Sequence, residues 1–105
     1  MNYFFDNIYV INLDKDKERL KKIILECKKF NIDFQRFSAI DPIDLSQNIL
    51  DKYIPKYIQQ NGTNTMIGCG LSHIFIWQDA IKQNYNNILV FEDDIIISDN
   101  FNEIL

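Results

Sequence analysis

The sequence predicts an α/β fold built on a parallel sheet, and three segments carry this prediction. The β-branched apolar segment Ile8–Leu13 is followed by a helical pattern and then by the alternating segment Phe34–Ala39. This order is typical of a β-α-β unit, in which a right-handed crossover joins two parallel strands. The apolar run Ile88–Phe91 is typical of a strand buried on both faces, as the strands of parallel sheets are.

The first helix is predicted to lie between the two strands of this unit. Asp14 and Asp16 are candidates for its N-cap, and Asn31 is its expected end. The apolar residues in between recur at the i, i+3, i+4 and i+7 positions of an amphipathic helix: Leu20, Ile23, Ile24, Cys27 and Phe30. The lysine and glutamate residues of the same segment then face water.

Two further helical regions follow the second strand. Residues 44–60 have a helical spacing that Pro55 interrupts, which predicts one or two short helices. After a loop over residues 61–64, the segment Ile67–Gln83 predicts a long helix with Trp77 packed in the core.

The end of the chain carries two signals. Ile95–Ile97 either continues the preceding strand or forms a neighbouring one. Asp99 and Asn100 are N-cap candidates, so that Phe101–Leu105 is expected to form the first turn of another helix. No internal repeat or domain boundary is visible, which predicts one small domain.

The composition is that of a globular protein, with 47% hydrophobic and 25% charged residues. The formal net charge of −4 argues against binding to nucleic acid or to an anionic membrane, because either partner requires a basic face. No apolar run approaches the ~20 residues of a transmembrane helix, and residues 1–6 do not resemble a signal peptide. We therefore expect a cytoplasmic protein whose two cysteines, Cys27 and Cys69, are buried, reduced thiols.

Three consecutive carboxylates, Glu92, Asp93 and Asp94, directly follow the third predicted strand. The carboxyl ends of strands form the edge at which open α/β sheets bind ligands. Since adjacent carboxylates repel one another, a divalent cation is the simplest partner that relieves the repulsion. Side chains at i and i+2 of extended backbone point to the same side, so Glu92 and Asp94 are expected to act together. The alternative is an acidic turn that water solvates.

Three segments of the chain resemble the motifs of one enzyme family. The first joins the opening strand, which ends in Asn12 and Leu13, to Glu18 and Arg19 in the first helix. The second is a Gly-Cys-x-x-Ser-His segment, and the third is a Glu-Asp-Asp motif. With these segments the chain resembles the amino-terminal half of glycosyltransferase family 25, the lipopolysaccharide biosynthesis glycosyltransferases related to collagen galactosyltransferases. The matching residues are 9–14 with 18–19, 67–73 with Trp77, 90–94 and also 37–41, whereas Met66 stands where the family usually has an acidic residue.

The resemblance implies a Rossmann-like fold of the GT-A type, truncated so that residues 1–105 form a single partial domain. It also implies transfer of a sugar, with galactose favoured, from a UDP-sugar to a lipooligosaccharide or another glycan. Mn²⁺ or Mg²⁺ would stabilise the charge of the departing nucleoside diphosphate. Asp94 is then expected to be the main metal ligand, with Glu92 or Asp93 helping through the ribose or a metal-bound water. The catalytic base is unknown and is expected in the other half of the family domain.

Four further residues are candidates for binding the donor. Asn12 ends the first strand and would hydrogen-bond the base or ribose, or would form an ordinary turn. Arg19 would approach the diphosphate, or would form a surface ion pair with Asp16. Ser72 and His73 would contact the phosphates or the sugar, or would hold the helix by packing and hydrogen bonds. Because His73 is the only histidine, a metal site of several histidines is excluded.

Other functions compete with sugar transfer. A non-catalytic remnant would bind a nucleotide or a partner chain without transferring a sugar. A phosphoacceptor receiver domain would need its acid pair after the first strand, whereas the acids of this chain come late. An incomplete sheet would leave a strand edge and an apolar face uncovered, which predicts self-association or a complementary downstream chain. A glycolipid acceptor would place the protein peripherally at the inner membrane.

Overall fold

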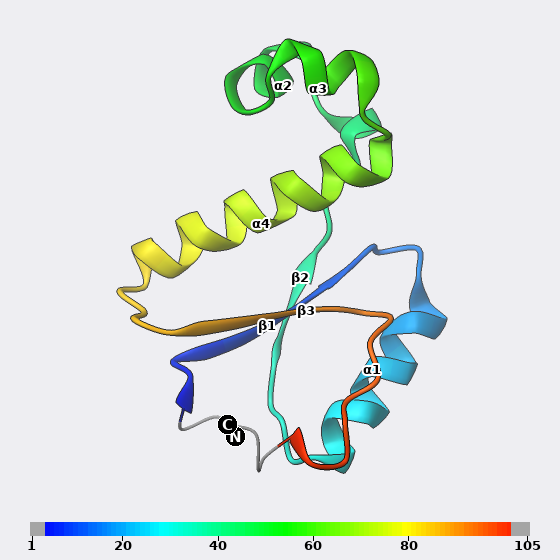
Figure 1. The fold of residues 1–105 in the computed structure, drawn as a ribbon, viewed down its shortest axis with the longest axis vertical. Helices are drawn as coiled ribbons and strands as arrows, with labels where there is room; N and C mark the ends of the chain where they lie inside the picture. Colours follow the sequence, from blue (N-terminus) through cyan, green and yellow to red (C-terminus); the bar gives the residue numbers. More distant parts are fainter. Residues whose placement is uncertain (1–3, 102–105) are drawn as a thin grey trace.

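Within residues 4–101, which the computed structural model describes, three parallel strands form the centre and helices cover both faces (Figure 1). The strands are β1 (Asn7–Asn12), β2 (Gln35–Ser38) and β3 (Ile88–Glu92), and β1 lies between the other two. Both pairings are parallel, so the predicted β-α-β unit is confirmed and the arrangement is that of a Rossmann-like fragment. The α-helices of the described residues are α1 (Lys17–Lys29), α2 (Gln47–Tyr53), α3 (Lys56–Asn61) and α4 (Asn64–Lys82), of which α1 and α4 cover the sheet.

β1 is the strand that is buried on both faces. Its side chains alternate, so that Ile8 and Val10 point to the layer of α1, while Tyr9 and Ile11 point to the layer of α4. β3 is only half-buried along its length and is an edge strand of the described sheet. The prediction that Ile88–Phe91 is buried on both faces is therefore wrong, because β1 occupies the central position.

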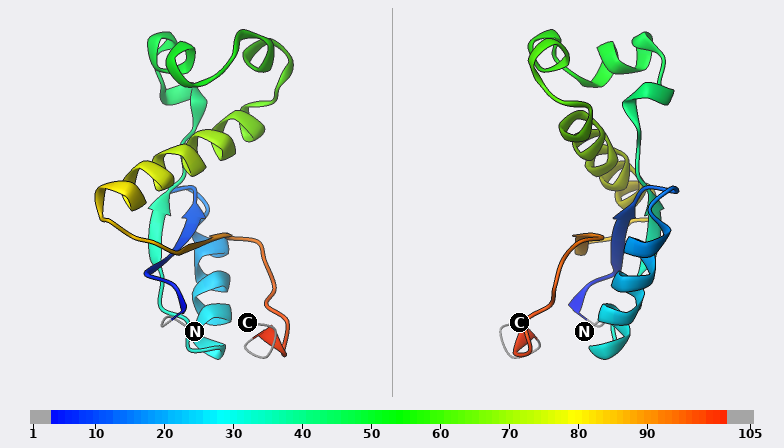
Figure 2. Two further views of the ribbon diagram at one scale, coloured as in Figure 1. Left: turned by 60° about the vertical axis from the view of Figure 1, so that its left-hand side comes forward. Right: turned by 90° about the vertical axis from the view of Figure 1, so that its right-hand side faces the viewer.

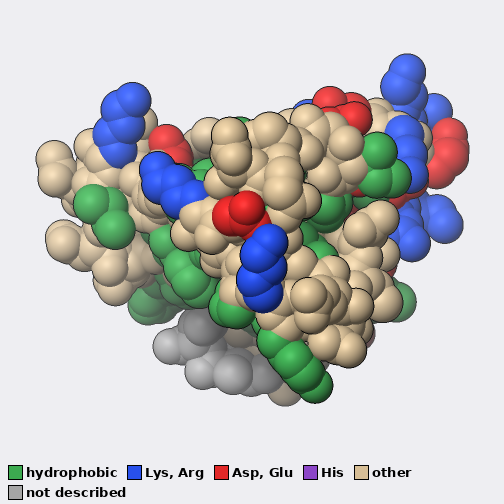
Figure 3. All heavy atoms as spheres, turned by 90° about the horizontal axis from the view of Figure 1, so that it is seen from above, with side chains coloured by type: hydrophobic (Ala, Val, Ile, Leu, Met, Phe, Trp, Pro, Cys, Tyr) green, Lys and Arg blue, Asp and Glu red, His purple; other side chains and the backbone are tan. Residues whose placement is uncertain are grey.

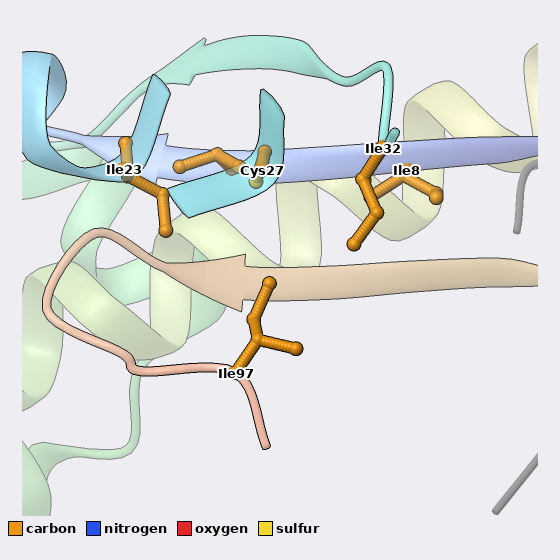
Figure 4. Close-up of a cluster of buried hydrophobic side chains, with 6 residues drawn as sticks. Ile8, Ile23, Cys27, Ile32 and Ile97 are labelled. Carbon is orange, nitrogen blue, oxygen red and sulfur yellow. The ribbon is translucent and has the colours of Figure 1, made fainter. Parts of the chain in front are cut away.

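α1 covers one face of the sheet through a cluster of buried apolar side chains (Figure 4). The cluster joins β1 to the inner face of α1 and to two later segments: Ile8, Val10, Ile23, Cys27, Ile32 and Ile97. The helix ends where the sequence predicts, since Asn31 adopts left-handed backbone with a φ of 55°. Asp16 occupies the N-cap position, but its side chain makes no cap hydrogen bond. Burial raises the pKa of the Cys27 thiol to about 11, so this cysteine is inert at neutral pH.

α4 covers the other face of the sheet, and Tyr9 is a polar link between them. The Tyr9 hydroxyl donates a hydrogen bond of 2.6 Å to Oδ2 of Asp79 on α4, and the Tyr9 ring belongs to a buried cluster with Ile11 and Ile76. Burial and the hydrogen bond to the Asp79 carboxylate raise the pKa of Tyr9 to about 12. The folded chain therefore holds this phenol in its neutral form.

The raised pKa of Tyr9 predicts a loss of stability in alkali. The folded state binds this proton more tightly, so the stabilisation is complete below the unfolded-state pKa of about 10. It is lost as the pH rises from about 10 through about 12. We expect Tyr9→Phe to flatten this part of the stability curve in urea unfolding between about pH 9 and about pH 11. Tyr57→Phe, at an exposed tyrosine of α3, is the control, and equal curves for the two variants would contradict the assignment.

α4 begins earlier than the sequence predicts. The pattern predicts a start at Ile67, whereas the helix begins at Asn64. The reason is a cap, because the Thr63 hydroxyl accepts a hydrogen bond of 3.1 Å from the backbone N–H of Met66. The glycines of the Gly-Cys segment consequently lie inside the helix and not at its start.

Two short helices stand beyond the sheet, at the N-terminal end of α4 (Figure 2). α2 and α3 are separated at Pro55, as the interrupted spacing predicts. Ile54, Ile67 and Leu71 are buried together where these helices meet α4. A 3₁₀ turn, Pro42–Asp44, leads from β2 into this group of helices.

Two predictions for the later part of the chain are wrong. Ile95–Ile97 forms no strand, because the chain turns at residues 93–94 and Ile97 then packs against α1. Trp77 is 54% exposed, because Ile76 and Ala80 form the inward face of α4 at this level. Apart from Phe101, the helix expected over residues 101–105 lies outside the described residues. None of the helices in the described part of the chain is both long and apolar enough to cross a membrane.

Candidate functional site

A cavity of about 360 Å³ opens at the carboxyl ends of the described strands. Its lining includes the turn after β1, the first turn of α1, the segment after β2, the start of α4 and the acidic motif. Apolar side chains such as Ile40 and Pro42 line it together with charged ones such as Arg19, Glu92 and Asp94. This is the edge at which α/β sheets bind ligands, and the volume falls within the range of small-molecule sites.

Asp93, the middle residue of the acidic motif, is only 9% exposed and is held by β1 and α1. Nδ2 of Asn12 donates hydrogen bonds of 2.8 Å to Oδ2 of Asp93 and of 3.1 Å to the backbone oxygen of Asp16. Nη1 of Arg19 lies 3.5 Å from Oδ1 of Asp93. Arg19 therefore forms its ion pair with the acidic motif and not with Asp16. The buried amide of Asn12 therefore ties the acidic motif to the end of β1.

Arg36 on β2 completes this arrangement, although the sequence pattern does not mark it as a site residue. Its Nε donates a hydrogen bond of 2.9 Å to Oδ1 of Asn12, and its Nη2 donates one of 3.1 Å to the backbone oxygen of Asn12. The same Nη2 lies 2.5 Å from Oδ1 of Asp14. Hydrogen bonds from Arg36, and then from Ser38, hold the pKa of Asp14 below its usual range. We call Asn12, Asp14, Arg19, Arg36 and Asp93 the Asn12 network.

Glu92 and Asp94 flank Asp93, and both are exposed. The Cys69 thiol of α4 donates a hydrogen bond of 3.3 Å to Oε1 of Glu92. Burial, and then the Glu92 carboxylate, raise the pKa of the Cys69 thiol. Cys69 is therefore protonated at neutral pH and is a poor nucleophile, although it lines the cavity. Cys27 and Cys69 are both free, but the prediction that both are buried holds only for Cys27, because Cys69 is half-buried at the cavity.

Ser72 and His73 both make hydrogen bonds within the fold. The buried Oγ of Ser72 accepts a hydrogen bond of 2.9 Å from the backbone N–H of Ile40 and donates one of 2.8 Å to the backbone oxygen of Gly68. Nδ1 of His73 lies 2.8 Å from the backbone oxygen of Cys69. Ser72 lines the cavity, whereas His73 is not part of its lining. These contacts match the alternative in which the segment holds α4, and donor binding by the two residues stays a prediction.

The carboxylates of the acidic motif fit a divalent cation only in part. Within residues 4–101, no three His, Cys, Asp or Glu side chains come together as a group that could hold a metal ion. Glu92 and Asp94 nevertheless offer the oxygen ligands that Mg²⁺ and Mn²⁺ prefer. Mg²⁺ is usually bound by one or two carboxylates together with the phosphates of a substrate. The residues present thus fit a cation that arrives with, or is completed by, a phosphorylated ligand.

A Rossmann-like sheet with a cavity at the carboxyl ends of its strands places this chain in the class of α/β proteins that bind their ligands at that edge. Residues 5–105 match the family described as glycosyltransferase family 25 (LPS biosynthesis protein). A putative glycosyltransferase of Haemophilus influenzae is 40% identical over 103 residues, which cover 92% of this chain and 35% of that protein. The lipooligosaccharide biosynthesis protein lic2B of Haemophilus influenzae is 30% identical over 97 residues, which cover 92% of this chain and 36% of that protein. The inactive glycosyltransferase 25 family member 3 of Mus musculus is 30% identical over 105 residues, which cover 92% of this chain and 18% of that protein.

The chain belongs to glycosyltransferase family 25, as its three motif segments predict. It spans about a third of the length of the two bacterial relatives, which is less than the half that the resemblance implies. Membership supports glycosyl transfer in general. Family membership alone does not show that a given member is active, since one of these relatives is named as inactive.

Proposed function

We propose that this chain forms the donor-binding part of a GT-A-type sugar transferase. Its cavity would bind a UDP-sugar, with galactose favoured, for transfer to a lipooligosaccharide or another glycan acceptor. The observation that carries the proposal is the cavity at the strand ends, in which the exposed Glu92 and Asp94 and the guanidinium of Arg19 occur together with apolar residues. Such a lining suits a ligand with a charged diphosphate and a flat, partly apolar base.

The chemistry of sugar transfer gives these residues separate roles. The bond between sugar C1 and the diphosphate oxygen breaks, and its electron pair leaves with the nucleoside diphosphate. The acceptor hydroxyl oxygen forms the new bond to C1, and its proton passes to a base that we assign to no residue of this chain. Arg19 would bind phosphate oxygens, since a guanidinium matches their geometry. Mn²⁺ or Mg²⁺, held by Glu92 and Asp94, would neutralise the leaving diphosphate.

Asp94→Ala is expected to weaken the binding of UDP in the presence of Mn²⁺ on the order of tenfold or more. The reason is the loss of a direct ligand, since even the outer partners of metal ligands are typically worth 10- to 100-fold. Isothermal titration of UDP into the purified chain, with and without Mn²⁺, measures the effect. Asp99→Ala removes an exposed carboxylate that does not line the cavity, and it should bind UDP like the unchanged chain. Absence of Mn²⁺-dependent binding in the folded, unchanged chain would sink the proposed donor site.

A second function is favoured by one fact about the relatives. The mouse relative that is named as inactive is similar over nearly the whole of this chain. A non-catalytic chain would bind a nucleotide, a second copy or a complementary downstream chain, and β2 and β3 are the edges of the described sheet at which a strand could add. UDP binding without release of UDP from UDP-galactose, in the presence of a glycolipid acceptor, would favour this alternative.

A further inference from the structure

The outer face of α1 carries an exposed leucine surrounded by lysines. Leu25 is 68% exposed, and Ile24 beside it is also exposed. On a helix the surface neighbours of a residue lie three and four positions away in each direction. For Leu25 all four neighbours are exposed lysines: Lys21, Lys22, Lys28 and Lys29. We call these four lysines with Ile24 and Leu25 the lysine face.

The lysine face is strongly basic although the protein as a whole is acidic. α1 carries six Lys and Arg residues and two Glu residues, whereas the chain has a net charge of −4. Glu26 is turned away, because its carboxylate accepts a hydrogen bond of 2.9 Å from the backbone N–H of Ile97. Glu18 pairs with Lys21 over 3.3 Å, and the exposed Asp33 lines a hollow together with Ile24 and Lys28. Figure 3 shows several Lys and Arg side chains, with Asp and Glu side chains among them, at the edge where Figure 1 places α1. Net charge therefore fails as an argument against an anionic surface, because one helix collects the basic residues.

We propose that the lysine face docks on an anionic lipid bilayer, with α1 lying along the membrane surface. The ammonium groups would reach lipid phosphates, while the aliphatic stems and Leu25 contact the boundary of the acyl chains. Clusters of four to eight basic residues on an amphipathic helix are typical of such binding, and each basic residue strengthens it about fivefold. The attraction acts within a Debye length, about 10 Å at 0.1 M salt, so the helix must lie close to the lipid.

The leucine distinguishes a bilayer from a nucleic acid as the partner. Acyl chains remove Leu25 and Ile24 from water, whereas a phosphate backbone gains little from them. Proteins that bind single strands without sequence preference add exposed aromatic side chains for base stacking, whereas the ring of Phe30, 5.6 Å from Nζ of Lys29, is half-buried against the core cluster of α1. The combination of four lysines with an exposed aliphatic centre thus favours lipid.

Docking through α1 would also place the cavity at the membrane. Arg19 lies in the first turn of α1, lines the cavity and contacts Asp93. The cavity is therefore at the N-terminal end of the helix that carries the lysine face. A glycolipid acceptor in the same bilayer would lie close to the cavity. This last step rests on the proposed function, whereas the docking of α1 does not.

Co-sedimentation with vesicles tests the proposal. The chain should bind vesicles that contain about 30% phosphatidylglycerol in phosphatidylcholine, and should bind pure phosphatidylcholine weakly. Raising the salt from about 0.1 M to about 0.5 M should release it. The double variant Lys22→Gln, Lys28→Gln should bind about 25-fold more weakly, because each lysine contributes about fivefold. Leu25→Gln should weaken binding without changing the charge.

The control is the double variant Lys52→Gln, Lys56→Gln, which makes the same charge change on α2 and α3. Equal losses in the two double variants, or no binding to anionic vesicles, would overturn the proposal. So would binding to a single-stranded oligonucleotide at least as tight as binding to the vesicles, and unaffected by Leu25→Gln. UDP titration of the same variants separates the two proposals, since loss of vesicle binding with UDP binding retained supports docking through α1. Failure of the unchanged chain to bind UDP concerns the donor site alone.

Discussion

Asn12→Leu is expected to lower the free energy of unfolding by about 3 kcal/mol. Asn12 is 2% exposed, and its amide stands between two charged groups. Its nitrogen donates to the carboxylate of Asp93, and its oxygen accepts from the guanidinium of Arg36. An amide is the side chain that meets both demands, since it has a donor and an acceptor on one short stem. Leucine fills a similar volume but leaves the Asp93 carboxylate and the Arg36 guanidinium without this partner. The cost of this loss exceeds the net free energy that the two hydrogen bonds contribute to folding.

Urea unfolding at neutral pH measures this loss, with Asn7→Leu as the matched control. Asn7 lies on the same strand and is half-buried, and its side-chain hydrogen bond of 2.8 Å to the neutral Gln35 is exposed. The control is expected to lose only about 1 kcal/mol, since it removes one hydrogen bond between neutral groups and leaves no charged group without a partner. A similar loss at both positions would show that the substitution harms the strand in general, and that the Asn12 network has no special weight.

The Asn12 network shows what strand ends in a sequence can and cannot reveal. That Asn12 and the acidic motif share one edge of the sheet follows from the parallel β-α-β pattern alone. Their direct contact depends on register, since Ile11 pairs with Glu92 and so sets Asn12 beside Asp93, 81 positions along the chain. No local pattern contains that register. The expected contact of Asn12 with a base or ribose is untested, but its amide is already engaged on both sides.

The sequence does not mark Arg36 as a site residue, for a related reason. The alternating pattern predicts only an ordinary polar residue on the solvent face of a strand. Its importance comes from the pairing of β2 with β1, which sets Arg36 opposite Val10, two residues before the pair of Ser38 and Asn12. From there its long side chain extends toward the carboxyl ends of the strands, where it contacts Asn12 and Asp14.

The strands and helices themselves were largely predictable, because periodicity and caps are local signals. The failures concern burial, which is a property of the assembled layers. Ile88–Phe91 reads as a doubly covered strand, yet β1 has the central place between α1 and α4. Trp77 lies on a helix that is apolar on several sides, so the sequence does not show which side faces the sheet.

Gly68→Ala and Gly70→Ala are expected to change stability in opposite directions. A Cβ added at Gly68 would overlap the backbone oxygen of Ile40 and would lie 3.2 Å from Cδ of Pro42. Because a backbone oxygen cannot rotate away, α4 and the segment after β2 must separate, at a net cost of about 2 kcal/mol. A Cβ at Gly70 meets nothing within 4 Å, so alanine there should stabilise the helix by about 1 kcal/mol.

The two glycine variants also test whether the close contact of α4 shapes the cavity. Ser72 lies one turn beyond Gly68, and its Oγ accepts a hydrogen bond from the backbone N–H of Ile40. Separation of α4 from the segment after β2 would therefore strain this hydrogen bond. Ile40, Gly68 and Ser72 all line the cavity. We therefore expect Gly68→Ala to weaken UDP binding in titrations as well as to lower the midpoint of urea unfolding, whereas Gly70→Ala raises the midpoint and leaves UDP binding unchanged. If alanine destabilised both positions equally, contact with Ile40 would not be the reason that position 68 is glycine.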